Sequence, residues 1–194
     1  MLILASASPR RQELLRNAGI PFVARPTDIP ETPNKNEAPR AFAERMAREK
    51  ALAVFDRESK NFVLGADTIV VVDSEILGKP RDNADADRML RLLSGRTHQV
   101  ITGVCLLGAE LSQNHKEKTF EDVRSETTAV SMNALGEADI ESYILSGEPM
   151  DKAGAYAIQG RASRWISRIE GDYFNVVGLP VSLVYRMMQE HDAL

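Results

Sequence analysis

The chain has 194 residues, the length of one domain or of two small lobes that share a core. Apolar residues make up 43% and charged residues 27%, which is typical of a folded globular protein and argues against disorder. The net charge is −4, whereas general nucleic-acid binders and proteins of anionic membrane surfaces usually carry a basic excess. We therefore expect neither nucleic acid nor a membrane as a partner.

The single cysteine, Cys105, excludes an intramolecular disulfide, and its apolar neighbours favour a buried, unreactive thiol. One cysteine and three histidines argue against a His/Cys zinc site. No apolar run approaches the ~20 residues of a membrane span, and the N-terminus lacks the basic start of a signal peptide. The sequence thus predicts a cytoplasmic protein.

Apolar periodicity and capping residues predict the elements of the first half of the chain. These are a strand at 2–5, a helix from Ser8 and Pro9 to Gly19, a strand at 22–24, a proline-rich loop at 26–39, a helix at 41–55, and a strand at 62–73 that Asp67 interrupts.

The second half alternates in the same way, so the whole pattern favours an α/β fold with a mixed sheet. Residues 175–180 are interpreted as a strand-to-helix turn. The other predicted elements are a turn at 78–81, a helix at 83–93 closed by Gly95, strands at 100–107 and 119–132 joined by a polar hairpin near 109–118, a helix at 136–146 ended by Gly147, strands at 155–158 and 165–169, and a helix at 179–189.

The first chemical motif, SerAlaSerProArgArg at 6–11, lies at a strand-to-helix junction. Arg10 and Arg11 fall in the first helical turn, where the helix dipole disfavours cations by ~0.3–1 kcal/mol each. Free backbone N–H groups, the serine hydroxyls and two guanidinium groups would suit a polyphosphate. The alternative is a solvated arginine pair, with Ser8 as an ordinary helix cap.

Asp67 is the second candidate, because every other residue from 62 to 72 is apolar, glycine or threonine. An unpaired carboxylate inside a sheet costs several kcal/mol. We therefore expect Asp67 at a bulge or strand end, facing a cavity, a cation or a metal. It is interpreted either as a metal ligand or general base, or as the cap of a turn before a new strand.

Three more charged residues, Glu31, Lys50 and Lys79, are each unremarkable when taken alone. Together with the arginine pair and Asp67 they outline a phosphate cage with one catalytic acid, which suits phosphoryl transfer. Residues 148–160 add a short predicted strand carrying Tyr156 and Gln159. The amide of Gln159 could read a base edge, or the segment could be a glycine-rich turn around an edge strand.

Six segments, at 6–11, 64–70, 78–81, 93–98, 151–160 and 175–180, resemble motifs of the Maf family of nucleoside triphosphate pyrophosphatases, in the same order. The resemblance covers essentially the whole chain. It implies that residues 1–194 form a single domain of two lobes, with a mixed twisted sheet related to that of inosine triphosphate pyrophosphatases (Ham1). It places the site in the cleft between the lobes and implies a homodimer.

The resemblance also implies the reaction: hydrolysis between the α- and β-phosphates to a nucleoside monophosphate and pyrophosphate, with Mg²⁺, Mn²⁺ or Co²⁺ as cofactor. Asp67 matches the family's catalytic acid, taken as the proton acceptor, and with Glu31 it matches the metal site. The positions that match phosphate-binding residues are Ser8, Arg11, Lys50 and Lys79.

Three selectivity positions, Arg10, Thr68 and Gln159, look like those of the subgroup that acts on dTTP and UTP. The sister subgroup, which acts on 7-methyl-GTP, tends to have an aromatic residue, Gln and Glu there. Two departures from the common pattern, Ala7 and Asp172, leave the implied chemistry intact. Modified nucleotides such as 5-methyl-UTP and pseudo-UTP are further candidate substrates. The family is also linked to arrest of septum formation, so the alternative is a non-catalytic nucleotide-binding regulator of cell division.

Overall fold

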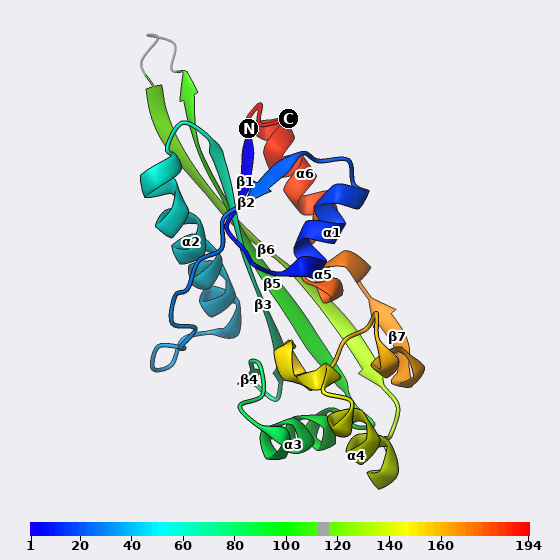
Figure 1. The fold of residues 1–194 in the computed structure, drawn as a ribbon. Helices are drawn as coiled ribbons and strands as arrows, with labels where there is room; N and C mark the ends of the chain where they lie inside the picture. Colours follow the sequence, from blue (N-terminus) through cyan, green and yellow to red (C-terminus); the bar gives the residue numbers. More distant parts are fainter. Residues whose placement is uncertain (112–116) are drawn as a thin grey trace. The chain divides into compact units, whose positions relative to one another are not determined.

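The structure is a computed structural model that describes residues 1–111 and 117–194 (Figure 1). The turn of the hairpin predicted near 109–118 lies outside the described residues. The chain divides into two compact units. Unit 1 consists of residues 1–67, 102–126 and 178–194, and unit 2 of residues 68–101 and 127–177.

The strands form a mixed sheet in the order β2-β1-β3-β5-β6-β7, with β4 paired to β3. β1 pairs in parallel with β2 and β3, whereas the pairs β3–β4 and β6–β7 are antiparallel. The predicted α/β class with a mixed sheet is therefore confirmed. The strands are β1 (Leu2–Leu4), β2 (Phe22–Ala24), β3 (Phe62–Val72), β4 (Glu75–Leu77), β5 (Thr97–Leu111), β6 (Glu117–Met132) and β7 (Ile166–Glu170).

Unit 1 contains the helices α1 (Pro9–Asn17), α2 (Pro39–Glu58) and α6 (Val181–Glu190). As predicted, Ser8 caps α1: its side chain accepts a hydrogen bond from the backbone N–H of Arg11. The chain leaves α1 through Gly19, whose φ of +69° suits a residue without a Cβ. Residues 25–38 form no helix or strand, which agrees with the predicted proline-rich loop.

Helix α2 lies directly on the strand that carries Asp67. A Cβ atom built on Gly65 of β3 would lie 2.1 Å from the carbonyl oxygen of Ala47 and 2.8 Å from the backbone N of Ala51. Only glycine permits this approach, because both neighbours are backbone atoms of the helix. The close contact sets the position of Lys50, which lies on the same helix.

We expect Gly65→Ala to lower the free energy of unfolding by about 1–3 kcal/mol, as overpacking of a core does, because β3 and α2 would have to separate. Chemical denaturation of both proteins measures the change. Gly78→Ala is the matched control, since a Cβ on Gly78 meets no atom within 4 Å. Equal stability of the two variants would contradict the tight contact.

Unit 2 contains α3 (Asn83–Leu93), α4 (Glu137–Leu145) and α5 (Tyr173–Val177), together with three short 3₁₀-helices. These are η1 (Glu148–Asp151), η2 (Ala153–Ala155) and η3 (Arg161–Trp165). The helices and strands enclose a core that includes Leu77, Leu90, Tyr143 and Trp165. Gly95 and Gly147 follow α3 and α4 with positive φ, as the predicted helix ends require.

Two predictions for unit 2 were wrong. Residues 155–158 do not form a strand, because Gly154 and Ala155 have φ of 67° and 59° and turn the chain into η2 instead. Residues 175–177 belong to α5, so the segment 175–180 joins two helices rather than a strand and a helix. The side chain of Asp172 accepts hydrogen bonds from the N–H groups of Phe174 and Asn175, and so caps α5.

Candidate active site

Asp67 lies in the middle of β3, where its side chain is buried and the residue is only 5% exposed. The expectation of a strand end at Asp67 was wrong, because β3 runs from Phe62 to Val72, while the alternative of a bulge stays a prediction. The strand tolerates the carboxylate because unit 1 supplies positive charge beside it. The expected cation is present in the form of a lysine side chain.

Lys50 on α2 joins the two candidate acids. Its Nζ donates a hydrogen bond to Oδ1 of Asp67 at 2.5 Å and another to Oε1 of Glu31 at 2.6 Å. The side chains of Lys50 and Asp67 are about 10% and 8% exposed, whereas that of Glu31 is 40% exposed. Two predicted site residues, Asp67 and Glu31, lie 17 and 19 positions from Lys50 in the sequence, and both contact its ammonium group.

Arg11 is the second buried cation of this cluster. Its Nε donates to the carbonyl oxygen of Gly178 at 2.8 Å, and its Nη1 donates to Oγ of Ser6 at 3.2 Å. The sequence analysis singled out the serine hydroxyls of this motif but missed the carbonyl of Gly178, since only the tertiary structure brings residue 178 to the first helix. Ser8 contacts Arg11 through its capping hydrogen bond.

The charges of this cluster are interdependent. Burial raises the pKa of Asp67, while the positive charges of Lys50 and Arg11 act in the opposite direction. Burial also lowers the pKa of Arg11, and the carboxylates of Asp67 and Glu31 oppose that shift. Arg10 adds a like charge next to Arg11 and lowers its pKa further. An anion entering beside Arg11 and Lys50 would therefore meet cations that are already desolvated and oriented.

The carboxylates of Glu31 and Asp67 provide oxygen ligands that suit Mg²⁺ or Mn²⁺. Both contact one Nζ atom, so they lie close enough together to share an ion. Among the described residues, no group of three or more His, Cys, Asp or Glu side chains could hold a metal. The donor set therefore fits an ion that takes its remaining ligands from substrate phosphates and water, as Mg²⁺ usually does.

The other three predicted residues, Thr68, Lys79 and Gln159, belong to unit 2. The segments that carry these residues meet at Gly154. Its N–H donates to the carbonyl oxygen of Gly78, next to Lys79, at 3.0 Å. Gly154 also packs closely on β3, since a Cβ atom built on it would lie 2.8 Å from the side chain of Val70. Thr68 is half-buried, whereas Lys79 and Gln159 are exposed.

Hydrogen bonds hold the segment that carries Gln159. The hydroxyl of Tyr143 donates to Glu148 at 2.9 Å and accepts from the N–H of Ala157 at 3.2 Å, and Glu148 also accepts from the N–H of Arg161. The hydroxyl of Tyr156 lies 2.7 Å from Nε2 of His98, whose pKa burial lowers to about 4. Gln159 thus extends from a fixed turn, although not from the predicted strand.

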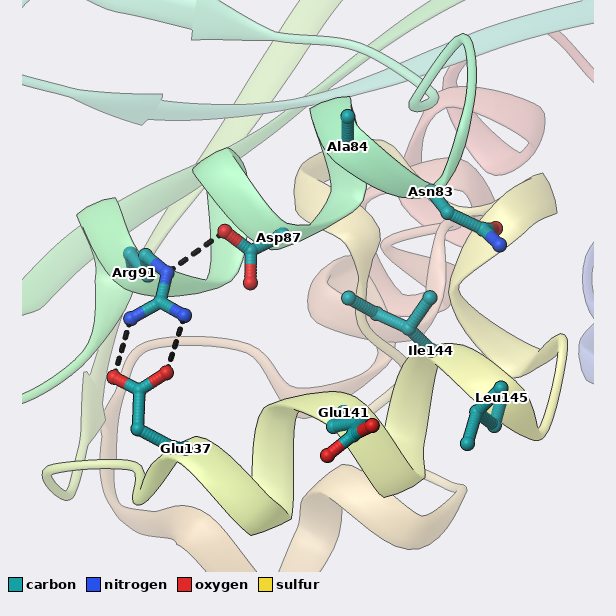
Figure 2. Close-up of a pocket in the computed structure, with 8 residues that line it drawn as sticks. All are labelled: Asn83, Ala84, Asp87, Arg91, Glu137, Glu141, Ile144 and Leu145. Atoms are coloured by element: carbon teal, nitrogen blue, oxygen red, sulfur yellow. Dashed lines mark hydrogen bonds and ion pairs between the residues drawn. The ribbon is translucent and has the colours of Figure 1, made fainter.

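A pocket of about 430 Å³ lies between α3 and α4 (Figure 2). Arg91 bridges Asp87 and Glu137 at one end, with hydrogen bonds of 2.5 Å to both oxygens of Glu137. Ile144 and Leu145 contribute apolar surface at the other end. None of the described residues that line this pocket is a predicted site residue, so the pocket and the candidate site are separate features.

The sequence model of the family described as Maf-like protein matches residues 1–191. The chain belongs to the Maf family. Among the described residues, no helix is long and apolar enough to cross a membrane.

Relatives in this family align over nearly their full length. A protein of Koribacter versatilis is 54% identical over 193 residues, covering 100% of this chain and 95% of the relative, and is named dTTP/UTP pyrophosphatase. A protein of Symbiobacterium thermophilum with the same name is 51% identical, covering 97% and 93%. Among solved structures, the Staphylococcus aureus Ham1 protein is similar in fold, with a TM-score of 0.50, 14% identity and coverage of 97% and 98%.

Proposed function

We propose that the protein is a nucleoside triphosphate pyrophosphatase that hydrolyses dTTP and UTP to the monophosphate and pyrophosphate. Two relatives at 54% and 51% identity bear the name dTTP/UTP pyrophosphatase. The single observation that carries the proposal is the buried Asp67, held 2.5 Å from Lys50 in unit 1. A carboxylate in this setting can accept a proton beside a group that neutralises phosphate charge.

In the proposed reaction, the oxygen of a water molecule bonds to one of the two phosphorus atoms that flank the α–β bridge. The bond between that phosphorus and the bridging oxygen breaks, so that the nucleoside monophosphate and pyrophosphate separate, and Asp67 takes one proton of the water. Lys50 and Arg11 offset the charge that develops on the phosphate oxygens. Ser8 and the N–H groups at the start of α1 would bind further phosphate oxygens, and we propose phosphate binding for Lys79 as well.

A divalent ion held by Glu31 and Asp67 would supply Lewis-acid polarisation of the phosphate and further charge neutralisation. The two carboxylates would bind and orient this ion.

Arg10, Thr68 and Gln159 are proposed to select a pyrimidine base. Because Gln159 reads only one edge of the base, substitutions at other edges need not disturb binding. We therefore propose 5-methyl-UTP and pseudo-UTP as further substrates. A homodimer and a cytoplasmic location stay predictions from the sequence.

The decisive experiment measures pyrophosphate release from UTP, dTTP, 5-methyl-UTP, pseudo-UTP, CTP, ATP and GTP with each of the three metal ions. We expect release to be fastest from UTP and dTTP and to require the metal. Binding of these nucleotides without release from any of them would favour the alternative, a non-catalytic regulator of cell division.

The pH dependence of the reaction should reflect the burial of Asp67. Its raised pKa means that the carboxyl keeps its proton, and so cannot accept another, at a pH where an ordinary aspartate with a pKa of 3.8 is ionised. We expect kcat/KM to fall with decreasing pH, with the midpoint above 3.8. More metal should move the midpoint to lower pH, because the ion binds the ionised carboxylate. If kcat/KM stayed constant down to the pH at which an ordinary aspartate takes up its proton, Asp67 would be excluded as the base.

A further inference from the structure

Glu31 lies in a loop that has no regular structure of its own, yet its carboxylate contacts Lys50 at 2.6 Å. Its side chain is 40% exposed, so burial does not hold it there. A flexible loop would leave the acid in place for only part of the time, and a ligand that needs it would bind correspondingly less tightly. Some other contact must fix this part of the loop.

Arg45 and Glu37 provide that contact. Nε and Nη2 of Arg45 donate to the two oxygens of Glu37 at 2.6 and 2.7 Å, a bidentate ion pair. The side chain of Glu37 is only 10% exposed, so the pair is screened less than a surface pair. The Arg45 side chain is held in turn by Glu49 at 2.9 Å and by the ring of Phe42.

The ion pair of Glu37 and Arg45 also forms hydrogen bonds with the backbone of the residues that follow Glu31. Nη2 of Arg45 also donates to the carbonyl oxygen of Thr32 at 3.0 Å, directly after Glu31 in the chain. The other side of the loop is tied by Glu37, which accepts from the N–H of Asn34 at 2.8 Å. Arg45 therefore fixes both ends of the segment 32–37 to α2, the helix that carries Lys50.

We propose that Glu37 and Arg45 are positioning residues that hold Glu31 beside Lys50, ready to bind the divalent ion. This inference rests on the proposed function for the role of the ion, but the contacts of Glu37 and Arg45 with the loop all lie within unit 1. Glu37 and Arg45 need not touch the substrate. Their effect should appear in metal binding and in the order of the loop rather than in the chemical step.

The test compares Arg45→Met, which keeps much of the alkyl chain over Phe42, with Arg48→Met as the matched control. Arg48 lies on the same helix and pairs with Glu121 at 2.6 Å, away from the loop. Glu37→Gln provides a second variant that keeps the side-chain shape. Hydrogen exchange of the Asn34 amide reports loop order. Electron paramagnetic resonance reports Mn²⁺ binding, with and without a UTP analogue whose α–β bridge carries NH.

We expect Arg45→Met and Glu37→Gln to speed exchange at Asn34 and to weaken Mn²⁺ binding about tenfold, as when the loop holds Glu31 in place only a tenth of the time. At saturating Mn²⁺, kcat should stay within about threefold of wild type, and Arg48→Met should match wild type throughout.

The proposal would be overturned if the variants left the exchange of the Asn34 amide unchanged, or if they loosened the loop without weakening Mn²⁺ binding. It would also be overturned if the wild type bound no Mn²⁺ either with or without the UTP analogue. Wild-type protein whose Mn²⁺ affinity depends on Glu37 and Arg45 as expected, but which releases no pyrophosphate, would refute the proposed function alone.

Discussion

Asp67→Asn is expected to lower kcat by about 10²–10⁴, the usual contribution of a general base, while nucleotide binding stays the same or tightens. Asparagine has nearly the same shape but accepts no proton under these conditions and is a poorer metal ligand. The change also removes a negative charge that repels the triphosphate. Lys50 keeps an acceptor, because the amide oxygen can replace Oδ1 and Glu31 still contacts Nζ at 2.6 Å.

The measurement is kcat from pyrophosphate release, together with the Kd of a non-hydrolysable UTP analogue. Asp122→Asn is the control for the same chemical change, since Asp122 is 13% exposed and ion-paired with Arg124 at 2.7 Å, outside the candidate site. If the Asp67 variant kept more than about a tenth of wild-type kcat, a loss of under ~1.4 kcal/mol, Asp67 would not be the catalytic base.

Gln159→Glu is expected to lower kcat/KM for UTP and dTTP by about 5- to 150-fold, the effect of ~1–3 kcal/mol for a mispaired, desolvated polar group. Uracil and thymine present an acceptor at O4 and a donor at N3. The Gln159 amide matches both, whereas a carboxylate can only accept and would face O4 with negative charge. The carboxylate suits the N1–H and N2–H₂ donors of guanine, so activity toward guanine nucleotides should rise, if only slightly.

The measurement is kcat/KM for UTP, dTTP, GTP and 7-methyl-GTP in both proteins. Gln189→Glu on α6 makes the same change at an exposed position outside the candidate site and should leave all four values unchanged. The turn that carries Gln159 is fixed through Glu148 and Tyr143, so a shift in selectivity would not reflect unfolding of the segment. An unchanged ratio of UTP to GTP activity would return Gln159 to the status of a surface residue.

Local sequence signals located the ends of several elements correctly. Ser8 and Pro9 begin α1, Gly95 and Gly147 follow α3 and α4, and α3 spans Asn83–Leu93 as predicted. These signals work because a cap or a positive φ depends on a few adjacent residues. The predicted start of β5, residue 100, was three residues too late. The buried position that precedes it in the strand is occupied by the polar His98, so the apolar pattern by which strands are recognised does not extend to it.

The errors at Asp67 and at 155–158 share a cause. The residues around Asp67 show a charge inside an apolar strand but do not show which cation compensates it, because Lys50 lies 17 positions away on α2. Likewise, Tyr156 and Ile158 alternate like a strand, but the contact of Gly154 with Val70 and Gly78 favours a tight turn. In both cases contacts between distant segments outweigh the local pattern.

The sequence by itself determined the mixed α/β class, the family and the types of group that could do the chemistry: one buried acid, several cations and an amide. It did so because motifs and periodicities are local properties of a chain. Only the tertiary structure decided that Lys50 bridges Asp67 and Glu31, that Gly178 orients Arg11, and that Arg45 fixes the loop before α2. These arrangements depend on distances of a few ångströms between residues far apart in sequence. The close approach of α2 to β3 at Gly65 makes one of them available, the contact of Lys50 with Asp67.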